Sequence, residues 1–412
     1  MLLHPSTSNF RSPVRNYNIL IVGGGIAGPA LAFFLHRYGM KPVVVERALQ
    51  LRASGQTVDL RAEGKEIVSR MGIESKVHEK TTQEQGVMII NSAGQSCASF
   101  DVNDSDGQSF TKEIEILRGD LVNILYQHTR NDVEYIFGDH PEAIHDRGNQ
   151  VHVKFASGNT RDFDLVVGAD GIHSKTRRLV FDEELPISYA DLYTAYFSIP
   201  HHESDGNWAR WYNAPGGRGI VLRPDNQGKT RVLLNFRSKE RGYENLDVAE
   251  QKCLLQKLFV DAGFEAPRIL NELSNADDFY LDSIGQVKMD HWTQGRVALV
   301  GDAGYCPSPI TGMGTTLAFV GAYILAGELA RNQDYIEAVK QYETLMRPYV
   351  TKAQKISPGS VSIATPQTST GIALRNVLLS FVARPAVSRL ITKLTSSKAP
   401  EKIVLPDYDA VF

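Results

Sequence analysis

Two glycine-rich motifs, far apart in the sequence, carry residue types that bind a phosphorylated cofactor. In the first, Gly23, Gly25 and Gly28 follow the apolar run NILIV and open an apolar segment with helical spacing. The first glycine permits a tight turn, the second lets backbone approach a pyrophosphate, and the third lets helix and strand pack closely. The helix N-terminus then offers N–H groups and a partial positive charge to phosphates.

A carboxylate completes this first motif. Glu46 ends the next apolar run, KPVVVE, where it can accept hydrogen bonds from an adenosine ribose. The order of strand, glycine turn, helix, strand and acid is that of a βαβ dinucleotide-binding unit. We therefore expect a bound dinucleotide, and an enzyme that uses only NAD remains an alternative at this point.

The second motif favours a flavin over a nicotinamide alone. The segment RVALVGDAGYCPSPITGMG places Asp302 directly after an apolar strand, where a carboxylate can bind a polyol such as a ribityl chain. Gly312, Met313 and Gly314 precede another apolar helix. Its N–H groups can face the N1–C2=O edge of a flavin, where negative charge develops on reduction. The alternative is a strand–turn–helix connection whose glycines serve packing.

Two further polar residues are ambiguous when taken alone. Asp170, in GADGIHSKTR, follows another apolar strand and could be no more than a turn aspartate. Arg118, in ILRGDL, could be a surface cation at the start of a helix. Their shared arrangement with the two glycine motifs supports a cofactor site.

The elements that must position these residues show two kinds of sequence pattern, which alternate along the chain. Strands are expected at 18–22, 41–46, 151–155 and 163–167, and helices at 26–38, 62–71 and 117–130, with two amphipathic helices at 317–331 and 336–349. Segments 86–91 and 98–102, with the alternating stretches YTAYFSI, GIVLRP and RVLLNFR, predict an antiparallel sheet, followed by a helix at 248–262.

Composition limits the classes of function. The net charge is −3 with no basic stripe, which argues against a nucleic-acid partner. Three widely spaced cysteines, Cys97, Cys253 and Cys306, argue against a disulfide framework and for a reducing compartment. Because no apolar run reaches transmembrane length, we expect no stable membrane insertion and a cytoplasmic enzyme. Residues 1–16 are expected to be a disordered lead-in.

The C-terminal stretch 370–393 predicts one or two helices broken by Pro385, and residues 371–400 include Arg and Lys but no acid. Contact with a membrane surface is one interpretation. The favoured one is a helix packed across a domain junction with its charges in water.

Residues for a substrate site are harder to assign. Arg210, Trp211 and Arg218, in NWARWYNAPGGRG, are candidates for lining a substrate cavity. The alternative is two cations on a sheet surface and a core tryptophan. His201 and His202 are adjacent, so on a strand they would point apart, and no set of ligand-spaced partners accompanies them; no metal is expected.

Taken together, these motifs show a resemblance to a known family. From residue 18 to about 349 the chain resembles the single-component, class A flavin monooxygenases of the aromatic-hydroxylase type, through GGGIAG with Glu46-Arg47, ILRGDL, GADGIHSKTR and GDAGYCPSP. Within them it is most similar to the tetracycline-inactivating group, through EIEILRGDL, DDFYLDSIGQVKMDHWTQGRVALVGDAGYCPSP and LAFVGAYILAGEL.

The resemblance implies an α/β fold, with a Rossmann-like FAD-binding domain, an interleaved antiparallel-sheet substrate domain and a C-terminal helix. The FAD-binding domain would comprise residues 17–85, 103–181 and 281–350, the substrate domain 86–102 and 182–280, and the C-terminal helical segment 351–412.

The resemblance also assigns roles at the cofactor site. Glu46 would hold the adenosine ribose, Arg118 the pyrophosphate and ribityl region, and Asp302 the ribityl hydroxyls. Asp170 belongs to a motif linked to both flavin and NADPH. Arg52 and Asp59, in RASGQTVDL, match positions near the nicotinamide and the flavin ring.

The implied reaction begins when NADPH reduces FAD. O2 then adds to flavin C4a, and the hydroperoxide transfers oxygen to an electron-rich carbon of a polycyclic phenol or enol, such as a polyketide or an antibiotic. The flavin carries the chemistry, so no catalytic triad is expected. A dehydrogenase or saturase of the same fold, and a non-catalytic binding protein, remain alternatives. We expect a monomer or a weak homo-oligomer.

The chain departs from the family pattern in three places. The usual Gly-Gln-Gly is Gly312-Met313-Gly314, an Asn pair is replaced by Thr315-Thr316, and Gly304-Tyr305 stands where the broader family has a histidine. The last departure is shared with the tetracycline-inactivating group but Met313 is not. These departures leave open whether tetracycline itself is the substrate.

Overall fold

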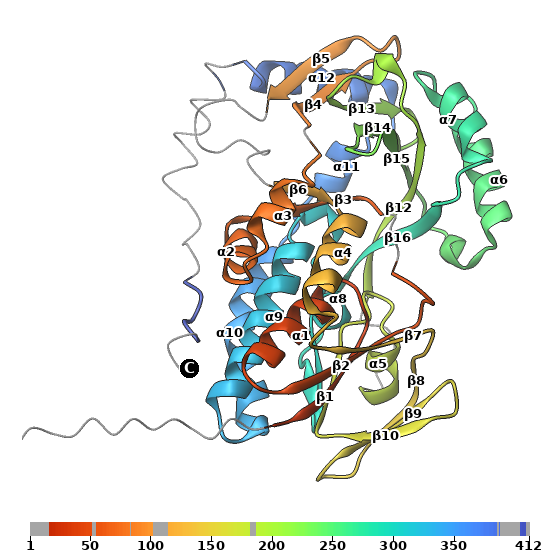
Figure 1. The fold of residues 1–412 in the computed structure, drawn as a ribbon. Coiled ribbons are helices and arrows are strands. Elements are labelled where there is room, and N and C mark those ends of the chain that lie inside the picture. Colours follow the sequence, from red (N-terminus) through yellow and green to blue (C-terminus); the bar gives the residue numbers. More distant parts are fainter. Residues whose placement is uncertain are drawn as a thin grey trace, which may run out of the picture.

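Two large β-sheets organise the chain, which passes repeatedly between them (Figure 1). The computed structural model describes residues 16–51, 55–82, 84–101, 114–181, 187–384, 387 and 404–408. The expected lead-in at 1–16, apart from its last residue, and the predicted site residue Arg52 lie outside the described residues.

The first sheet has six strands in the order β17-β18-β11-β1-β2-β7 and is parallel except at β17. Its strands are β1 (Asn18–Val22), β2 (Lys41–Glu46), β7 (Glu134–Phe137), β11 (Leu165–Gly168), β17 (Thr293–Gln294) and β18 (Val297–Leu299). The expected strand–turn–helix–strand unit at the N-terminus is therefore confirmed.

The second sheet has seven strands in the order β16-β12-β15-β14-β13-β4-β5, antiparallel except between β13 and β4. Its strands are β4 (Gly86–Ile90), β5 (Ser96–Asp101), β12 (Ile187–Pro200), β13 (Ala209–Ala214), β14 (Arg218–Pro224), β15 (Lys229–Arg237) and β16 (Tyr280–Val287). The predicted antiparallel sheet thus combines strands from two separate parts of the sequence. β4 and β5 precede β7 and β11 of the parallel sheet, and β12 to β16 follow them.

Two small sheets complete the strands. One comprises β8 (Pro141–Asp146), β9 (Val151–Phe155) and β10 (Thr160–Phe163), and the other β3 (Thr57–Leu60) and β6 (Ile114–Leu117). The strand predicted at 163–167 is wrong in its extent, because β10 ends at Phe163 and β11 begins at Leu165 in a different sheet.

Helices cover one face of the parallel sheet and lie on both faces of the seven-stranded sheet. Against the parallel sheet and one another lie α1 (Ala27–Arg37), α2 (Ala62–Arg70), α3 (Glu74–His78), α4 (Arg118–Thr129), α9 (Gly314–Arg331) and α10 (Tyr335–Ala353). Short helices α5 (Lys175–Val180) and α8 (Asp302–Tyr305) follow strand ends. On the second sheet lie α6 (Val248–Phe259), α7 (Ala266–Leu273), α11 (Ser360–Ala364) and α12 (Ser369–Val382).

The parallel sheet is buried on both faces. Ile19 and Ile21 of β1 pack in the core that contains α1 and α9, whereas Leu20 and Val22 pack against the small sheet β8-β9-β10. A strand buried on both sides has no polar alternation, and this explains why NILIV is a continuous apolar run.

Helix α9 corrects one expectation. The sequence predicts an amphipathic helix, yet residues 315–329 are all buried, because α1, α2 and α10 surround it. A helix that is apolar on all sides belongs in the interior. Small residues allow this packing: at Gly327 a Cβ would collide with the ring of Tyr408, from the C-terminal segment.

The proposed division into domains stays a prediction. Strand β16 crosses the expected boundary at residue 281, since it pairs with β12 in the seven-stranded sheet up to Val287. The chain re-enters the parallel sheet only at β17 and β18.

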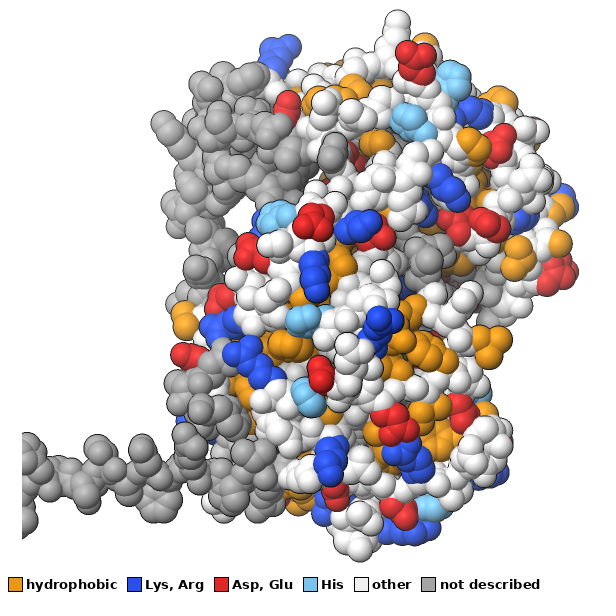
Figure 2. All heavy atoms as spheres, in the orientation of Figure 1, with side chains coloured by type: hydrophobic (Ala, Val, Ile, Leu, Met, Phe, Trp, Pro, Cys, Tyr) orange, Lys and Arg blue, Asp and Glu red, His pale blue; other side chains and the backbone are white. Residues whose placement is uncertain are grey.

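On the face shown in Figure 2, acidic and basic side chains are interspersed. Within the described part of the chain, no helix is long and apolar enough to cross a membrane.

Candidate cofactor site

A cavity of about 790 Å³ lies where the two large sheets meet. This volume is within the usual range for ligand pockets. From the parallel-sheet side its lining includes Gly23, Gly24, Gly25, Glu46, Arg47, Arg118, Asp170 and Asp302. From the other side come Tyr196, Arg223 and Leu233 of the seven-stranded sheet, with Asp59, Gly312 and Gly314 between. The cavity therefore gathers nearly all the predicted cofactor residues.

The first glycine turn has the close approaches that its sequence predicts. Gly23 has φ +116°, and a Cβ there would lie 2.5 Å from the carbonyl oxygen of Ala169. At Gly28 a Cβ would collide with the carbonyl oxygen of Gly23, so this glycine serves packing and lies off the cavity. At Gly25 a Cβ would meet only Arg118 Nη2, at 3.3 Å, and would project into the cavity wall. The turn thus leaves open backbone where a pyrophosphate fits.

Glu46 is fixed in position by two backbone donors. Gly24 N donates to Oε2 at 2.8 Å and Ala48 N donates to Oε1 at 2.9 Å. The carboxylate consequently stands at the end of β2 beside the glycine turn and keeps acceptor capacity for a ribose hydroxyl. Arg47, the next residue, is exposed at the cavity rim.

The second motif places a carboxylate and a helix N-terminus at the same wall. Burial raises the pKa of Asp302, and a nearby Cys306 thiol and Arg118 partly offset that effect. Gly314 begins α9, has no side-chain cap before it, and lines the cavity with Thr315. An uncapped helix start presents free N–H groups and a positive partial charge to a bound acceptor.

Met313 does not line the cavity. Its sulfur accepts a hydrogen bond from Arg61 Nη1 at 3.4 Å, and Thr316 Oγ1 accepts one from Arg61 N at 3.2 Å. The residues that replace the family's Gln and Asn therefore join the start of α9 to the β3–α2 connection. Gly312 adopts φ +62°, which a side chain would disfavour.

Asp170 lines the cavity, but its carboxylate is already bound within its own motif. Oδ1 accepts from Ser174 Oγ at 2.5 Å, and Oδ2 accepts from Thr176 N at 2.9 Å and Thr176 Oγ1 at 3.0 Å. Sequence reasoning missed its neighbour Arg177, which is buried and donates to the carbonyls of Ala303 and Ile172, both at 2.7 Å. Arg177 thereby ties the GADGIHSKTR and GDA motifs together.

Asp59 faces the cavity between Gly312 and a buried charged cluster that the sequence did not reveal. Burial first, and then the negative charge of Glu115, raise its pKa, and no described residue donates a hydrogen bond to it. Arg223 contacts Glu84 Oε2 at 2.9 Å and Glu115 Oε2 at 2.8 Å. Glu84 and Glu115 are 31 residues apart, so no local pattern could have identified the cluster.

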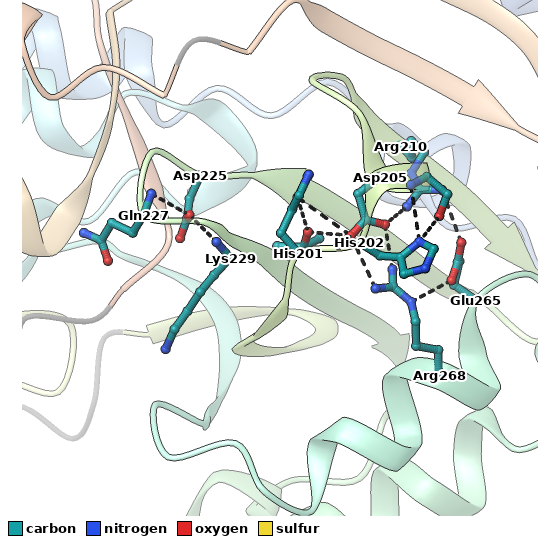
Figure 3. A network of polar contacts seen from close by, with 11 residues as sticks. His201, His202, Asp205, Arg210, Asp225, Gln227, Lys229, Glu265 and Arg268 are labelled. Carbon is teal, nitrogen blue, oxygen red and sulfur yellow. Dashed lines mark hydrogen bonds and ion pairs between the residues drawn. The ribbon is translucent and has the colours of Figure 1, made fainter.

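The three predicted substrate residues lie outside the cavity lining. Successive residues of a strand point to opposite faces. Arg210 points to the face covered by α7, where Asp205 and Glu265 bind it as part of the network in Figure 3. Arg218 donates to Asp261 Oδ1 and the Leu258 carbonyl, both at 2.5 Å, near α6. These two arginines thus have structural partners, and nothing in the geometry supports a substrate role for them.

The two adjacent histidines contact different neighbours. His201 Nδ1 is 3.1 Å from Thr230 Oγ1, and His202 Nδ1 is 2.8 Å from Ser204 Oγ (Figure 3 labels both histidines). Among the described residues, no group of three or more His, Cys, Asp or Glu side chains is arranged to hold a metal ion. All three cysteines are free, and burial raises the pKa of the Cys306 thiol far above its usual value.

Known proteins share this architecture. The FAD binding domain family matches residues 16–355. An FAD-dependent monooxygenase, asL6 of Sarocladium schorii, is 36% identical over 417 residues, covering 95% of this chain and 97% of the relative. A flavin-dependent monooxygenase of Legionella longbeachae is 39% identical over 347 residues, covering 83% and 88%.

A solved structure agrees with these relatives. The crystal structure of tetracycline destructase Tet(51) is similar with a TM-score of 0.78 at 34% identity, covering 96% of this chain and 100% of that one. The resemblance to tetracycline-inactivating flavin enzymes is therefore confirmed. Sequence, fold and the glycine-lined cavity agree, and the chain belongs to the FAD binding domain family as an FAD-dependent monooxygenase.

Proposed function

We propose that this enzyme consumes NADPH and O2 to hydroxylate a polycyclic phenol or enol, a class that includes polyketides and tetracycline-like antibiotics. The proposal rests on the cavity, which joins the glycine turn, Asp302 and the start of α9 to the seven-stranded sheet. The names of the relatives, among them tetracycline destructases, support the substrate class. We also propose a cytoplasmic location.

The residues present fit FAD. Gly23 and Gly25 leave a backbone cradle that side chains would fill, and Glu46 keeps acceptor capacity beside it. In our proposal Glu46 holds the ribose, Arg118 the pyrophosphate, and Asp302 the ribityl hydroxyls. The uncapped N-terminus of α9 stabilises negative charge on the ring. When bound and reduced, FAD supplies the activation of O2 and the transfer of one oxygen atom.

Other groups of the chain act on the substrate. A phenol or enol reacts best as its anion, so it must lose a proton. Asp59 has a raised pKa and accepts no hydrogen bond from a described residue, so we propose that its carboxylate accepts that proton. The half-buried apolar side chain of Leu233, and the ring of Tyr196, would exclude water from the reacting edge.

The test begins with the visible spectrum of the purified protein, followed by NADPH oxidation with a panel of polycyclic phenols and tetracyclines. We expect flavin absorption bands, substrate-stimulated NADPH consumption and a product heavier by one oxygen. With ¹⁸O2 the product should carry the label. An unlabelled, dehydrogenated product would replace hydroxylation by the dehydrogenase alternative, and a protein that takes up no FAD would refute the cofactor site.

A further inference from the structure

One buried arginine of the C-terminal helix has no acidic partner. Arg375, on α12, is 6% exposed, and its guanidinium lies 4.7 Å from the ring centre of Trp211. Nη1 donates weakly to Asn376 Oδ1 at 3.4 Å, and Nε is buried without a partner. Among the described residues no carboxylate pairs with it, and burial alone lowers the pKa of Arg375 to about 10. The expectation that the charges of this helix lie in water is therefore wrong for Arg375.

By contrast, three arginines of the seven-stranded sheet on which this helix packs are neutralised. Arg210 contacts Asp205, Arg223 contacts Glu84, and Arg231 contacts Asp225. A buried cation without a counter-charge is unfavourable, and an apolar side chain would pack there at lower cost. No described group balances the charge of Arg375. A ligand that carries a negative charge would explain why an arginine stands at this buried position.

The position of Trp211 connects this arginine to the cavity. Across the seven-stranded sheet, Trp211 pairs with Val221, Val221 with Leu233, and Leu233 with Tyr196. Directly paired residues share a face, and the last two of these residues line the cavity. The four side chains therefore form one row. Two strand spacings, roughly 10 Å, separate Trp211 from Leu233.

This row is on the face opposite α6 and α7. The alternate residues Tyr212, Ile220, Leu222 and Leu234 are buried in the core that α6 and α7 complete. Trp211, Val221 and Leu233 are only half-buried, so their face is not sealed. α12 packs on β5 and β13 at the far end of the row (Figure 1).

We propose that Arg375 and Trp211 form a substrate subsite that selects a planar, anionic polycyclic compound. The ring system would extend from the cavity along Leu233 and Val221, stack on Trp211 and pair its acidic group with Arg375. This inference rests on the proposed function and narrows its substrate class to compounds that carry a negative charge remote from the reacting ring. The proposed subsite requires a ligand that carries both a fixed negative charge and an aromatic ring system. Two ring compounds, one anionic and one neutral, can therefore test it.

The probes are anthraquinone-2-sulfonate, a permanent anion, and 2-(hydroxymethyl)anthraquinone, its neutral counterpart. Their affinities for the FAD-loaded protein are measured by titration calorimetry. We expect the sulfonate to bind about ten- to a hundredfold more tightly, as one charge-assisted contact allows. Arg375→Met should abolish this preference and leave the neutral affinity unchanged, whereas Arg375→Lys should keep part of it. Trp211→Leu should weaken both probes.

Arg384→Met is the matched control, because Arg384 is an exposed cation just past the end of the same helix and its guanidinium lies over the ring of Phe381. It should preserve both affinities. Thermal melting adds a readout that a structural role would move the other way: Arg375→Met should melt at or above the wild-type temperature. Equal binding of the two probes by the wild type, or an unchanged preference in Arg375→Met, would overturn the proposal. FAD content and NADPH oxidation are recorded separately, so failure of the monooxygenase assignment is distinguishable.

Discussion

Replacing Gly25 by alanine tests the binding of FAD separately from the folding of the apoprotein. Gly25 does not adopt a positive φ, so alanine fits its backbone without strain. The new Cβ would meet only the end of a flexible side chain, Arg118 Nη2, at 3.3 Å. It would, however, occupy the wall where we place the pyrophosphate. Gly25→Ala should therefore lower FAD affinity while the apoprotein stays folded.

The expected sizes of the loss of FAD affinity and of the change in apoprotein stability follow from the structure. Displacing the pyrophosphate by a methyl radius costs at least one hydrogen bond to a charged group, about 1.5–3 kcal/mol. That corresponds to a roughly 10- to 150-fold larger dissociation constant for FAD. The apoprotein should gain stability slightly, by about 0.4–1 kcal/mol, because alanine restricts the unfolded chain more than glycine does.

Gly28→Ala is the matched comparison. Its Cβ would collide with the carbonyl oxygen of Gly23, which is backbone and cannot rotate away. This variant should lose about 1–3 kcal/mol of apoprotein stability as well as FAD affinity. FAD titration by quenching of flavin fluorescence, together with urea unfolding of each apoprotein, checks both. An unchanged FAD affinity in Gly25→Ala would show that the pyrophosphate does not lie at this turn.

Three further changes test the fold and the site. Burial raises the pKa of Asp302, so its ionisation destabilises the apoprotein increasingly as pH rises above 3.8. Apo Asp302→Asn should melt above the wild type at pH 7, with the gap closing towards pH 3.8, yet bind FAD more weakly; a lower melting temperature at pH 7 would contradict this. Gly327→Ala puts a Cβ into the ring of Tyr408 and should cost about 1–3 kcal/mol in urea unfolding despite the better helix propensity. Arg231→Met removes the buried cation that Asp225 and Asp278 share and should cost about 3–5 kcal/mol, and a loss below 1 kcal/mol would refute the pairing.

The cofactor end of the cavity could be predicted because its signals are local. Gly23, Gly25 and Gly28 lie within six residues, and Glu46 follows at the end of the next strand. Each requirement is met by neighbouring atoms: a turn with φ +116°, a close helix and a carboxylate held by two backbone donors. Asp302 was found by the same logic, since it comes three residues after the end of β18 at Leu299.

Elements that depend on distant partners were predicted less well. Nothing near residues 317–331 says that α1, α2 and α10 enclose this helix, so its complete burial was not foreseen. The same applies to Arg177 and Arg223. Their roles come from the carbonyl of Ala303 and from two glutamates of other segments, which only the folded chain brings to them.

The residues proposed for substrate binding show most clearly what residue spacing in the sequence cannot predict. Strand alternation states that Arg210 and Trp211 point to opposite faces, but it does not state which face is covered by α6 and α7. The structure decides this: Arg210 joins Asp205 beneath α7, and Trp211 lies in the row that reaches the cavity. Arg375 reaches that ring from a helix more than 160 residues later in the chain. The charge that we propose as selective for the substrate thus belongs to the C-terminal helix, because both arginines first suspected on the sheet already have acidic partners.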